Sequence, residues 1–438
     1  MSLYSETFYA DAINRLFSER ETIGYMLKVE AALAEAQASL GIIPKEAAMV
    51  ISASCNVDFI DVNKLKTDIV LGGNAAIPLV QQLTKIIKNT DFEASKYVHF
   101  GATSQDIIDT ANILAIKEYI TWTEEKILLL EKVLVQITNQ HKGTIMIGRT
   151  LLQQARPITF GFKTAGWLQS VTNTKKRVQA IKSQLFHIQL GGAVGSGNIT
   201  ITEEVQAKFA EILGLEKSFP WQSQRDTLND FAGILGVLSG SLGKIAKDIS
   251  LMMQTEIAEV FEGAAEGKGG SSTMPHKRNP VTCALILSNS TRTPGLVSTM
   301  LAAMVQEHER SAGYWHAEWE TLTQLMGLTA GSLEKSLDLI QHLEVSPEHM
   351  LRNIEITNGL IYAEKVSLYL SKSIGKMQAH EAVKKACKSA VSEERHLKEV
   401  VQEAFPDITD LETLFQPENA IGNSVSWVET ILKNYNTD

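Results

Sequence analysis

Apolar residues recur at alternating steps of three and four along two long stretches of the chain. The first stretch covers residues 113–137 and is interrupted only by Thr123. The second covers residues 228–252 without interruption. This spacing is the a/d stripe along which long helices pack side by side. The pattern predicts two long helices, the second running from about residue 226 to residue 261.

Glycines form a second stripe along the second predicted helix, at Gly233, Gly236, Gly240 and Gly243. Each glycine costs about 1 kcal/mol relative to alanine in a helix interior, so we interpret the stripe as a surface that a neighbouring helix approaches closely. A helix with apolar or small residues on several sides needs several neighbours. We therefore expect a central bundle of long helices that other subunits extend. A bundle formed by one chain alone is the alternative.

Shorter helical patterns flank the central stretch. Apolar positions in residues 26–40 have helical spacing, and the pattern stops at Gly41 and Pro44. Near the other end of the chain, Ser346 is an expected N-cap, with Pro347 at the first helical position. Strand signals are scarce, apart from one short extended piece expected near residue 200.

Proline is scarce and unevenly placed, with 10 prolines in 438 residues and none between Pro78 and Pro157. Proline breaks helix interiors, so long gaps between prolines permit long helices. We predict an all-α fold in which a central bundle of long helices lies between two smaller helical domains. The expected domains are residues 1–110, 111–346 and 347–438.

Composition narrows the functional classes. Hydrophobic residues make up 44% and charged residues 21% of the chain, which favours a large core and excludes a mostly disordered protein. The net charge of −9 argues against nucleic acid or an anionic membrane as the main partner. The three cysteines form neither a disulfide framework nor a CxxC metal motif. The first residues lack the pattern of a signal peptide, so we expect a cytoplasmic protein.

The most unusual segment covers residues 267–280 and reads GKGGSSTMPHKRNP. Glycines, hydroxyl groups, cations and an amide follow one another closely in it. Such a mixture suits a segment that closes over an anion, and a solvated loop between helices is the alternative. The order of glycine, lysine and hydroxyl residues is wrong for a Walker loop.

Other polar segments carry weaker signals. Residues 99–106 precede the first long helix, where hydroxyl groups can cap the helix or its N–H groups can bind an anion. Residues 148–157 hold two arginines and two glutamines before a proline. The His/Glu mixture in residues 306–319 lacks HExxH spacing, so no metal site is expected. The glycines of residues 191–197 lack the strand–helix frame of a dinucleotide site.

Three of these segments together resemble one family. Residues 271–280 are similar to the G-S-S-x-M-P-x-K-x-N-P signature of the fumarase/aspartase superfamily. Residues 99–106 resemble its Thr-Ser-x-Asp segment, and residues 148–161 resemble its second active-site segment, in the same order along the chain. The resemblance implies the three-domain, all-α protomer of that superfamily. It also implies a homotetramer in which each site takes its three segments from three different subunits.

Within the superfamily, residues 149–155 resemble the branch of bacterial 3-carboxy-cis,cis-muconate cycloisomerases. Adenylosuccinate lyases have a G-R-T-H-x-x-H stretch whose second histidine is the general acid, whereas this chain has Leu151 and Gln154 there. The cycloisomerase branch implies lactone formation in the breakdown of aromatic acids. An adenylosuccinate lyase or another fumarate-releasing C–N lyase is the alternative enzyme, and a non-catalytic helical scaffold is the alternative of another class.

The resemblance also implies a mechanism without cofactor or metal, because the substrate carries its own nucleophile and electron sink. One substrate carboxylate attacks the diene, and another gains charge in an aci-carboxylate intermediate. By position in the signature, Ser271 transfers the proton, while Lys277 and Asn279 bind the carboxylate that gains charge. The residues expected to bind substrate are His99, Thr103, Ser104, Gln105, Arg149, Gln154, Ser272, Met274, His276 and Arg310. The expected partners are a small polycarboxylate and other copies of the chain, with neither nucleic acid nor membrane.

Overall fold

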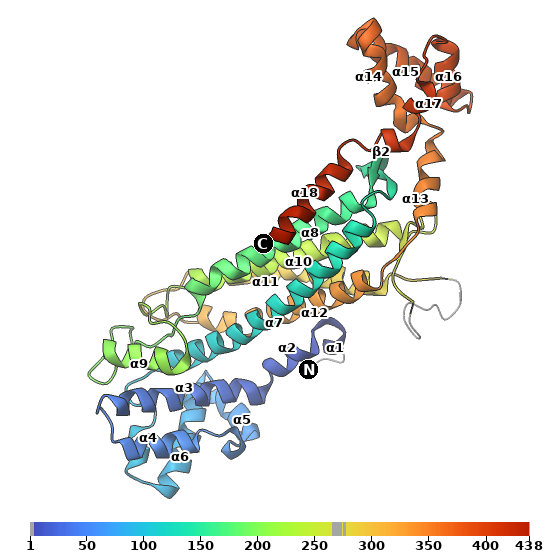
Figure 1. The fold of residues 1–438 in the computed structure, drawn as a ribbon. Coiled ribbons are helices and arrows are strands. Elements are labelled where there is room, and N and C mark those ends of the chain that lie inside the picture. Colours follow the sequence, from blue (N-terminus) through green and yellow to red (C-terminus); the bar gives the residue numbers. More distant parts are fainter. Residues whose placement is uncertain (1–3, 265–273, 275–276, 438) are drawn as a thin grey trace. The chain divides into compact units, whose positions relative to one another are not determined.

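The computed structural model describes residues 4–264, 274 and 277–437, and helices dominate it (Figure 1). This confirms the predicted all-α class. The only strands within that part of the chain form two antiparallel pairs, β1 with β2 and β3 with β4. The longest helices are α7 (Ser104–Gln140), α8 (Phe160–Leu185), α10 (Asp226–Met252), α11 (Val281–Ala303) and α12 (Tyr314–Gln341).

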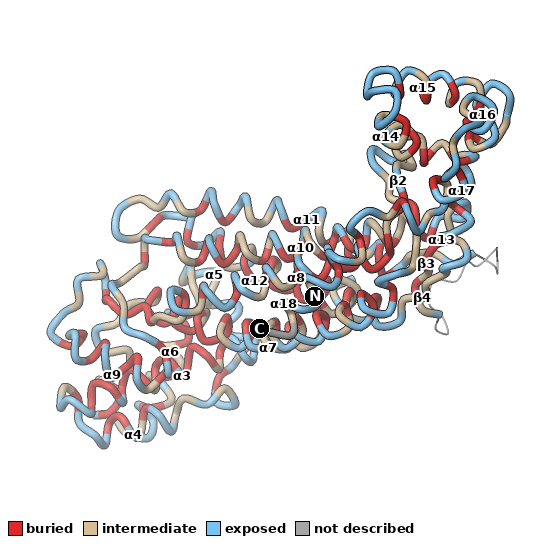
Figure 2. Tube along the Cα trace, turned by 45° about the horizontal axis from the view of Figure 1, so that its top comes forward, coloured by how far each residue is buried: buried red, intermediate tan, exposed pale blue. Residues whose placement is uncertain are grey.

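The two apolar stripes lie in the core, as predicted. In α7 every stripe residue from Ile113 to Ile137 is buried, and so is Thr123. In α10 the whole stripe from Leu228 to Met252 is buried. Figure 2 shows buried positions recurring along the long helices. Fully burying one large apolar side chain stabilises the fold by about 1.5–3 kcal/mol, so these stripes account for much of the stability of the two helices.

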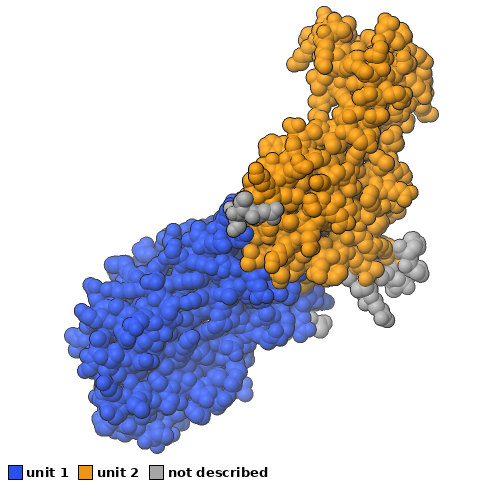
Figure 3. All heavy atoms as spheres, viewed as in Figure 1, with its two compact units in different colours: residues 1–126, 174–240, 288–334 blue, residues 127–173, 241–287, 335–438 orange. Residues whose placement is uncertain are grey.

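The chain divides into two compact units (Figure 3). Unit 1 comprises residues 1–126, 174–240 and 288–334, and unit 2 comprises residues 127–173, 241–287 and 335–438. Each of the five longest helices contributes residues to both units. The three-domain division of the chain is a different partition and stays a prediction.

Unit 1 contains the shorter helices of the first part of the chain. Its helix α3 packs against α4 and α9, and α3 ends at Ser39, just before the Gly41 stop predicted from the sequence. None of the helices among the described residues of the chain is long and apolar enough to cross a membrane. The shorter helices of unit 1 are α1 (Ser5–Phe8), α2 (Asp11–Leu16), α3 (Glu19–Ser39), α4 (Lys45–Ser54), α5 (Val62–Gly72), α6 (Ala76–Thr90) and α9 (Glu203–Leu213).

Unit 2 contains the strands and the C-terminal helices. Ser346 caps α13 by accepting from the backbone N–H of His349, with Pro347 in the first turn, as predicted. The strands are β1 (Ile145–Thr150), β2 (Gln153–Thr159), β3 (Val260–Phe261) and β4 (Glu344–Val345). The helices are α13 (Pro347–Ile354), α14 (Ala363–Ile374), α15 (Lys376–Ser392), α16 (Leu397–Ala404), α17 (Leu411–Leu414) and α18 (Ser424–Thr437). Short 3₁₀ helices complete both units: η1 (Val57–Phe59), η2 (Ala94–Tyr97), η3 (Glu355–Thr357), η4 (Leu360–Tyr362) and η5 (Pro417–Asn419).

The glycine stripe of α10 permits a close helix approach at one position within unit 1. A Cβ atom on Gly236 would lie 2.9 Å from Cγ2 of Val297 in α11, a separation that real Cβ atoms do not reach. At Gly233 and Gly240 the corresponding point has no atom of the described chain within 4 Å. Of Gly233, Gly236 and Gly240, close packing against α11 therefore accounts for Gly236.

Helix α10 ends at Met252, earlier than the predicted end near residue 261. Ala258 adopts the left-handed conformation with φ of 51°, which a continuing helix does not allow. The backbone N–H of Glu259 then donates to the carbonyl of Met252, and β3 pairs with β4. The prediction was wrong here because these residues leave the helix to pair with sequence-distant partners.

Two further segments differ from the prediction. The expected extended piece near residue 200 is a turn in which the Asn198 side chain accepts from the N–H groups of Thr200 and Ile201. The β1–β2 hairpin was not predicted. Its two-residue turn places Leu151 and Leu152 at φ of 49° and 65°. Such turns normally carry Asn or Gly, so the leucines give no sequence signal for a hairpin.

Candidate functional site

The first predicted segment forms the N-terminus of α7 in unit 1. Thr103 precedes the helix, and its backbone N–H donates to Oδ2 of Asp106 over 3.0 Å. This is one half of a capping box, in which the third helical residue reaches back to the cap. Ser104 is the first residue of α7 and is half-buried. The sequence suggested capping by hydroxyl groups, whereas the observed contact comes from the carboxylate of Asp106, and the Thr103 hydroxyl contacts Arg310.

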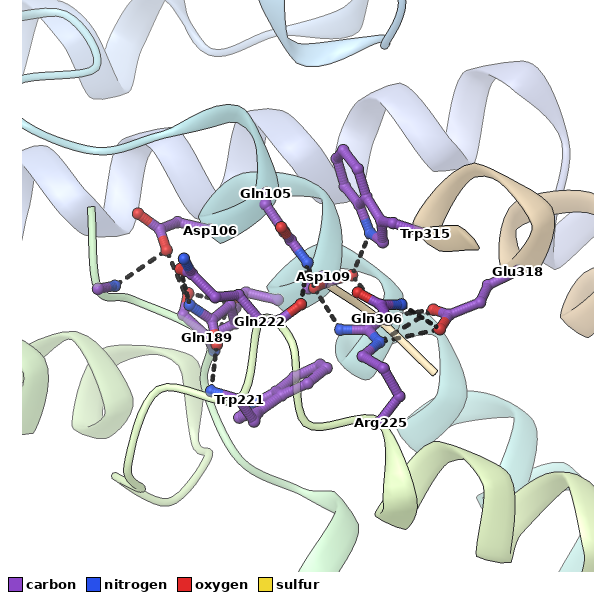
Figure 4. A network of polar contacts seen from close by, with 12 residues as sticks. Gln105, Asp106, Asp109, Gln189, Trp221, Gln222, Arg225, Gln306, Trp315 and Glu318 are labelled. Atoms are coloured by element: carbon purple, nitrogen blue, oxygen red, sulfur yellow. Dashed lines mark hydrogen bonds and ion pairs between the residues drawn. The ribbon is translucent and has the colours of Figure 1, made fainter. Parts of the chain in front are cut away.

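Asp106 also fixes the glycine-rich loop beside α7. Its carboxylate accepts from the backbone N–H groups of Gly191 and Gly192, each over 2.9 Å, and from Nε2 of Gln189 over 3.0 Å (Figure 4). Burial raises the pKa of Asp106, and the hydrogen bonds from Gln189, Gly191, Thr103 and Gly192 oppose that rise. The loop N–H groups that could bind a phosphate are thus used inside the protein.

Arg310 reaches the same end of α7 from a distant part of the chain. Its guanidinium donates to Oγ1 of Thr103 over 2.8 Å and to the carbonyl of Ala193 over 3.2 Å. Its Nε is buried without a hydrogen-bond partner among the described residues. Unit 1 therefore brings together two residues that the sequence predicted as carboxylate binders, Thr103 and Arg310.

Gln105 points into a buried polar network rather than to the surface (Figure 4). It is fully buried, and its Nε2 donates to Oδ2 of Asp109 over 3.0 Å and to the carbonyl of Gln222 over 2.7 Å. Gln222 in turn donates to the carbonyl of Glu309 over 2.9 Å. The side chain of Gln105 thus links the first segment to the loops that carry Gln222 and Arg310.

A buried arginine lies at the centre of this network. The guanidinium of Arg225 donates to both oxygens of Asp109 and to both oxygens of Glu318, over distances of 2.5–3.1 Å (Figure 4). All three side chains are at most 4% exposed. Trp315 donates to Oδ1 of Asp109 over 3.1 Å. Arg225 directly precedes α10, so this buried cation joins the start of α10 to α7 and α12 within unit 1.

His99 makes an ion-pair contact with α3. Its Nδ1 lies 2.7 Å from Oε1 of Glu30, which is 1% exposed, while the His99 side chain is 20% exposed. Burial lowers the pKa of His99, but the charge and hydrogen bond of Glu30 and the charge of Asp106 outweigh it, so the pKa is raised overall. The imidazole is therefore held closer to its charged form than a free histidine.

The second predicted segment is the β1–β2 hairpin of unit 2. Arg149 pairs in a bidentate manner with Glu259, through contacts of 2.9 and 2.7 Å, and Glu259 is fully buried. Nδ2 of Asn353 donates to the same carboxylate over 3.0 Å, and Nε2 of Gln154 donates to the carbonyl of Asn353 over 2.9 Å. At the tip, the Leu151 residue is 97% exposed. Arg149 and Gln154 thus lie on one hairpin that buried partners hold.

The third predicted segment is described only in part. Ser271, Ser272 and His276 lie outside the described residues. Met274 and Lys277 are exposed and Asn279 is half-buried, and the backbone N–H of Lys277 donates to the carbonyl of Met274 over 3.0 Å.

Arg278 connects the third segment to the β3–β4 pair of unit 2. Its guanidinium pairs with both oxygens of Glu344 over 2.8 Å and donates to the carbonyl of Glu262. The carboxylate of Glu262 accepts from the N–H groups of Thr282 and Cys283 at the start of α11, over 3.1 and 2.8 Å. These contacts fix the chain on both sides of Asn279.

The predicted residues fall into two groups. His99, Thr103, Ser104, Gln105 and Arg310 belong to unit 1, and Arg149, Gln154, Met274, Lys277 and Asn279 belong to unit 2. Within residues 4–264, 274 and 277–437, no cluster of three or more His, Cys, Asp or Glu side chains is arranged to hold a metal ion.

The buried carboxylate partners that the sequence analysis missed include Glu30, Glu259 and Glu318. Glu30 had a detectable signal, because it places an acid beside Val29 on the apolar side of a helix. Glu318 lies in the His/Glu-rich segment 306–319, but neither it nor Glu259 reveals its partner in the sequence, since each pairs with an arginine about a hundred residues away, Arg225 and Arg149.

Comparisons with known proteins place these segments in context. A family model described as "Lyase" matches residues 6–295, and one described as "Adenylosuccinate lyase C-terminus" matches residues 359–431. A 3-carboxy-cis,cis-muconate cycloisomerase of Acinetobacter baylyi is 44% identical, covering 98% of this chain and 98% of its own length. One of Pseudomonas aeruginosa is 43% identical, covering 98% and 95%. The crystal structure of the 3-carboxy-cis,cis-muconate lactonizing enzyme of Pseudomonas putida matches with a TM-score of 0.95 at 42% identity over 99% of both chains.

Proposed function

Since the chain belongs to the lyase family of the fumarase/aspartase superfamily, we propose that it is a cycloisomerase that converts 3-carboxy-cis,cis-muconate to a carboxymuconolactone. The observation that carries this proposal is the full-length similarity to relatives bearing that activity in their names. Leu151 and Gln154 support it, because both positions hold histidine in adenylosuccinate lyases and neither side chain here can protonate a leaving amine. The same proposal implies that the substrate arises in the breakdown of aromatic acids.

The reaction needs an internal nucleophile, an electron sink and one proton. One substrate carboxylate forms a C–O bond to the diene, and the electron pair of the broken π bond moves onto a second carboxylate. A proton then adds to the carbon beside that carboxylate, so one proton is consumed for each lactone formed. The enzyme has to hold the reacting atoms close together and stabilise the charge that accumulates.

The site residues divide these tasks. Ser271 delivers the proton and recovers one from water, while Lys277 and Asn279 bind the carboxylate that gains charge. In unit 1, Thr103 and Arg310 form a polar pair at the N-terminus of α7, which suits a substrate carboxylate that the positive end of the helix also attracts. His99, Ser104 and Gln154 are proposed to anchor the remaining carboxylates.

Two other predicted residues, Arg149 and Gln105, contact protein groups instead of substrate. Arg149 forms an ion pair with the buried Glu259. Gln105 donates hydrogen bonds to Asp109 and to the carbonyl of Gln222. Both therefore orient the segments that bind substrate, the β1–β2 hairpin and the first turn of α7. Ser272, Met274 and His276 belong to the signature segment and are proposed to line the same site.

We also propose a homotetramer whose sites combine segments of different subunits. Exposed apolar side chains on the long helices support this assembly, among them Leu128, Val237 and Leu301, which are 43%, 47% and 53% exposed. The open space at Gly233 and Gly240 supports it too, since a helix of another copy would fill it. A cytoplasmic location stays a prediction.

Two assays test these proposals. The purified protein is incubated with 3-carboxy-cis,cis-muconate and, in parallel, with adenylosuccinate, while ultraviolet absorbance follows the diene and fumarate release is measured. We expect the diene absorbance to fall and no fumarate to form. Fumarate release without loss of the diene would identify a C–N lyase. Inactivity on both substrates would identify a non-catalytic scaffold.

For the shared site, two inactive variants, Ser271→Ala and Thr103→Ala, are unfolded together and refolded as mixed oligomers. Recovered activity is expected, because some sites then combine intact segments from both variants. A stable, active monomer in light scattering would refute the shared site.

A further inference from the structure

Helix α3 carries two polar residues on its buried side. Glu30 and Gln37 lie two helical turns apart and are 1% and 0% exposed. Their neighbours Val29, Leu33 and Ala36 are buried apolar residues of the same helix. A buried carboxylate is costly unless it is paired, so its presence on this side of α3 requires a partner.

Both side chains reach the segment that leads into α7. Oε1 of Glu30 lies 2.7 Å from Nδ1 of His99, and Nε2 of Gln37 donates to the carbonyl of Phe100 over 2.7 Å. Nε2 of Gln37 also donates to the carbonyl of Thr200 over 3.0 Å. Helix α3 therefore holds two consecutive residues of the first active-site segment, one by its side chain and one by its backbone.

The backbone of this segment adopts an unusual conformation. His99 has φ of 56°, in the left-handed region that non-glycine residues seldom occupy. Gly101, with φ of 81°, lies so near Thr200 that a Cβ atom there would be 1.9 Å from Oγ1. Such conformations persist where the surrounding contacts hold them, and they concentrate at functional sites. Glu30, Gln37 and Thr200 supply the contacts here.

The contact with Glu30 uses only one of the two ring nitrogens of His99. Within the described residues, Nε2 makes no hydrogen bond, and the side chain is 20% exposed. Four residues further along the chain, Thr103 accepts a hydrogen bond from Arg310, and this pair is the proposed carboxylate site. Nε2 is thus the one ring nitrogen that a ligand at this end of α7 can use.

The charges around the imidazole all favour its protonated form. Glu30 on α3 and Asp106 on α7 act on it, and the burial that opposes them is outweighed. Cys55, at the end of α4, faces Glu30 and stays a neutral thiol, because burial and the Glu30 charge both raise its pKa. The second oxygen of Glu30 has no hydrogen-bond partner in the described chain, so His99 is the group that compensates this carboxylate.

We propose that Glu30 is a positioning residue that keeps His99 protonated and turns its Nδ1–H toward α3, so that the Nε2–H donates to one carboxylate of the substrate. The identity of the ligand as a polycarboxylate rests on the proposed function. The geometry of the Glu30–His99 pair does not depend on the proposed function.

The first test needs no substrate. His99 is followed by NMR of protein labelled at histidine, with its signal assigned through His99→Asn. In the wild type the imidazole should titrate above about pH 6.5, the value of a histidine in a peptide. In Glu30→Gln it should titrate below that value, because burial remains while the compensating charge is lost. Gln37→Met is the matched control, since it changes the same side of α3 without touching the imidazole. Equal titration midpoints in the wild type and Glu30→Gln would overturn the proposal.

The second test measures KM and kcat against pH with 3-carboxy-cis,cis-muconate. Glu30→Gln should raise KM about tenfold near neutral pH, the effect of losing one hydrogen bond from a charged donor, with kcat changed less than about twofold. In the His99→Asn background, Glu30→Gln should cause no further rise. Equal losses in Gln37→Met and Glu30→Gln would mean a merely structural role and overturn the proposal. If the wild type does not convert this substrate, the proposed function fails while the NMR titration still decides the role of Glu30.

Discussion

Replacing Arg225 by methionine removes the one cation that two buried carboxylates share. Methionine fills similar space but leaves Asp109 and Glu318 facing each other at 1% and 4% exposure. Removing one partner of a buried ion pair costs about 3–5 kcal/mol. Because two carboxylates lose their partner here, we expect a loss near the upper end, about 5 kcal/mol in the free energy of unfolding of unit 1.

Proton uptake by a buried carboxylate limits the loss of stability in Arg225→Met and makes that loss depend on pH. Burial raises the pKa of Glu318, and Arg225 opposes the rise. Without Arg225 the folded-state pKa of Glu318 rises further above its unfolded value. A carboxyl with a raised folded pKa stabilises the fold at low pH and loses this contribution as the pH rises through that pKa. The Arg225→Met variant should therefore lose stability more steeply than the wild type as the pH rises above the ordinary pKa of a glutamate.

Hydrogen exchange measured by mass spectrometry separates this effect from changes elsewhere. Peptides of α7 and α10 that belong to unit 1 should exchange much faster in Arg225→Met, while peptides of α14 and α15 in unit 2 should not change. Arg395→Met is the matched control, because Arg395 also faces several glutamates but at the surface. Unchanged exchange in unit 1, or an equal effect of Arg395→Met, would refute the reasoning.

Three further substitutions, with Gly41→Ala as a control for one of them, test the site and its support. Ser271→Ala should abolish turnover while circular dichroism and light scattering show an unchanged fold and oligomer; near-normal turnover would contradict its role. Lys277→Ala should lower kcat/KM by about 3–4 kcal/mol of transition-state stabilisation, as for other charge-stabilising donors, and a change confined to KM would argue against that role. Gly101→Ala should destabilise unit 1 by more than 2 kcal/mol, roughly the strain of a left-handed residue plus the clash with Thr200. Gly41, also left-handed, has no atom of the described chain near its Cβ position, so Gly41→Ala should cost only about 1 kcal/mol. Denaturant titration of both variants measures the two losses, and equal losses would contradict the clash.

Local patterns predicted much of the helical framework. The stripes of α7 and α10 are buried along their whole lengths, and Ser346 caps α13 where the sequence placed the cap. These features depend on neighbours within a few residues, which a sequence displays directly. The end of α10 was wrong because its last turns are replaced by contacts of Glu259 with Arg149, which lie far apart in sequence.

The residues of the candidate site could be proposed from the sequence, and they stay a prediction; the side chains that hold them in place could not be predicted. The Thr103 and Asp106 spacing displays a cap, yet nothing in the sequence indicates that Arg310 donates to Thr103. The pairs of Arg225 likewise join segments about a hundred residues apart. Such pairs depend on how the helices pack, and packing is fixed by the whole core rather than by any short pattern.

The most direct test of the proposed activity is an NMR spectrum of the reaction run in deuterium oxide. The account predicts that 3-carboxy-cis,cis-muconate is converted to a carboxymuconolactone carrying one solvent deuterium at the carbon beside the carboxylate that gained charge. That label would show that ring closure and a single proton transfer both occurred. Unchanged substrate in the presence of folded, oligomeric protein would contradict the account.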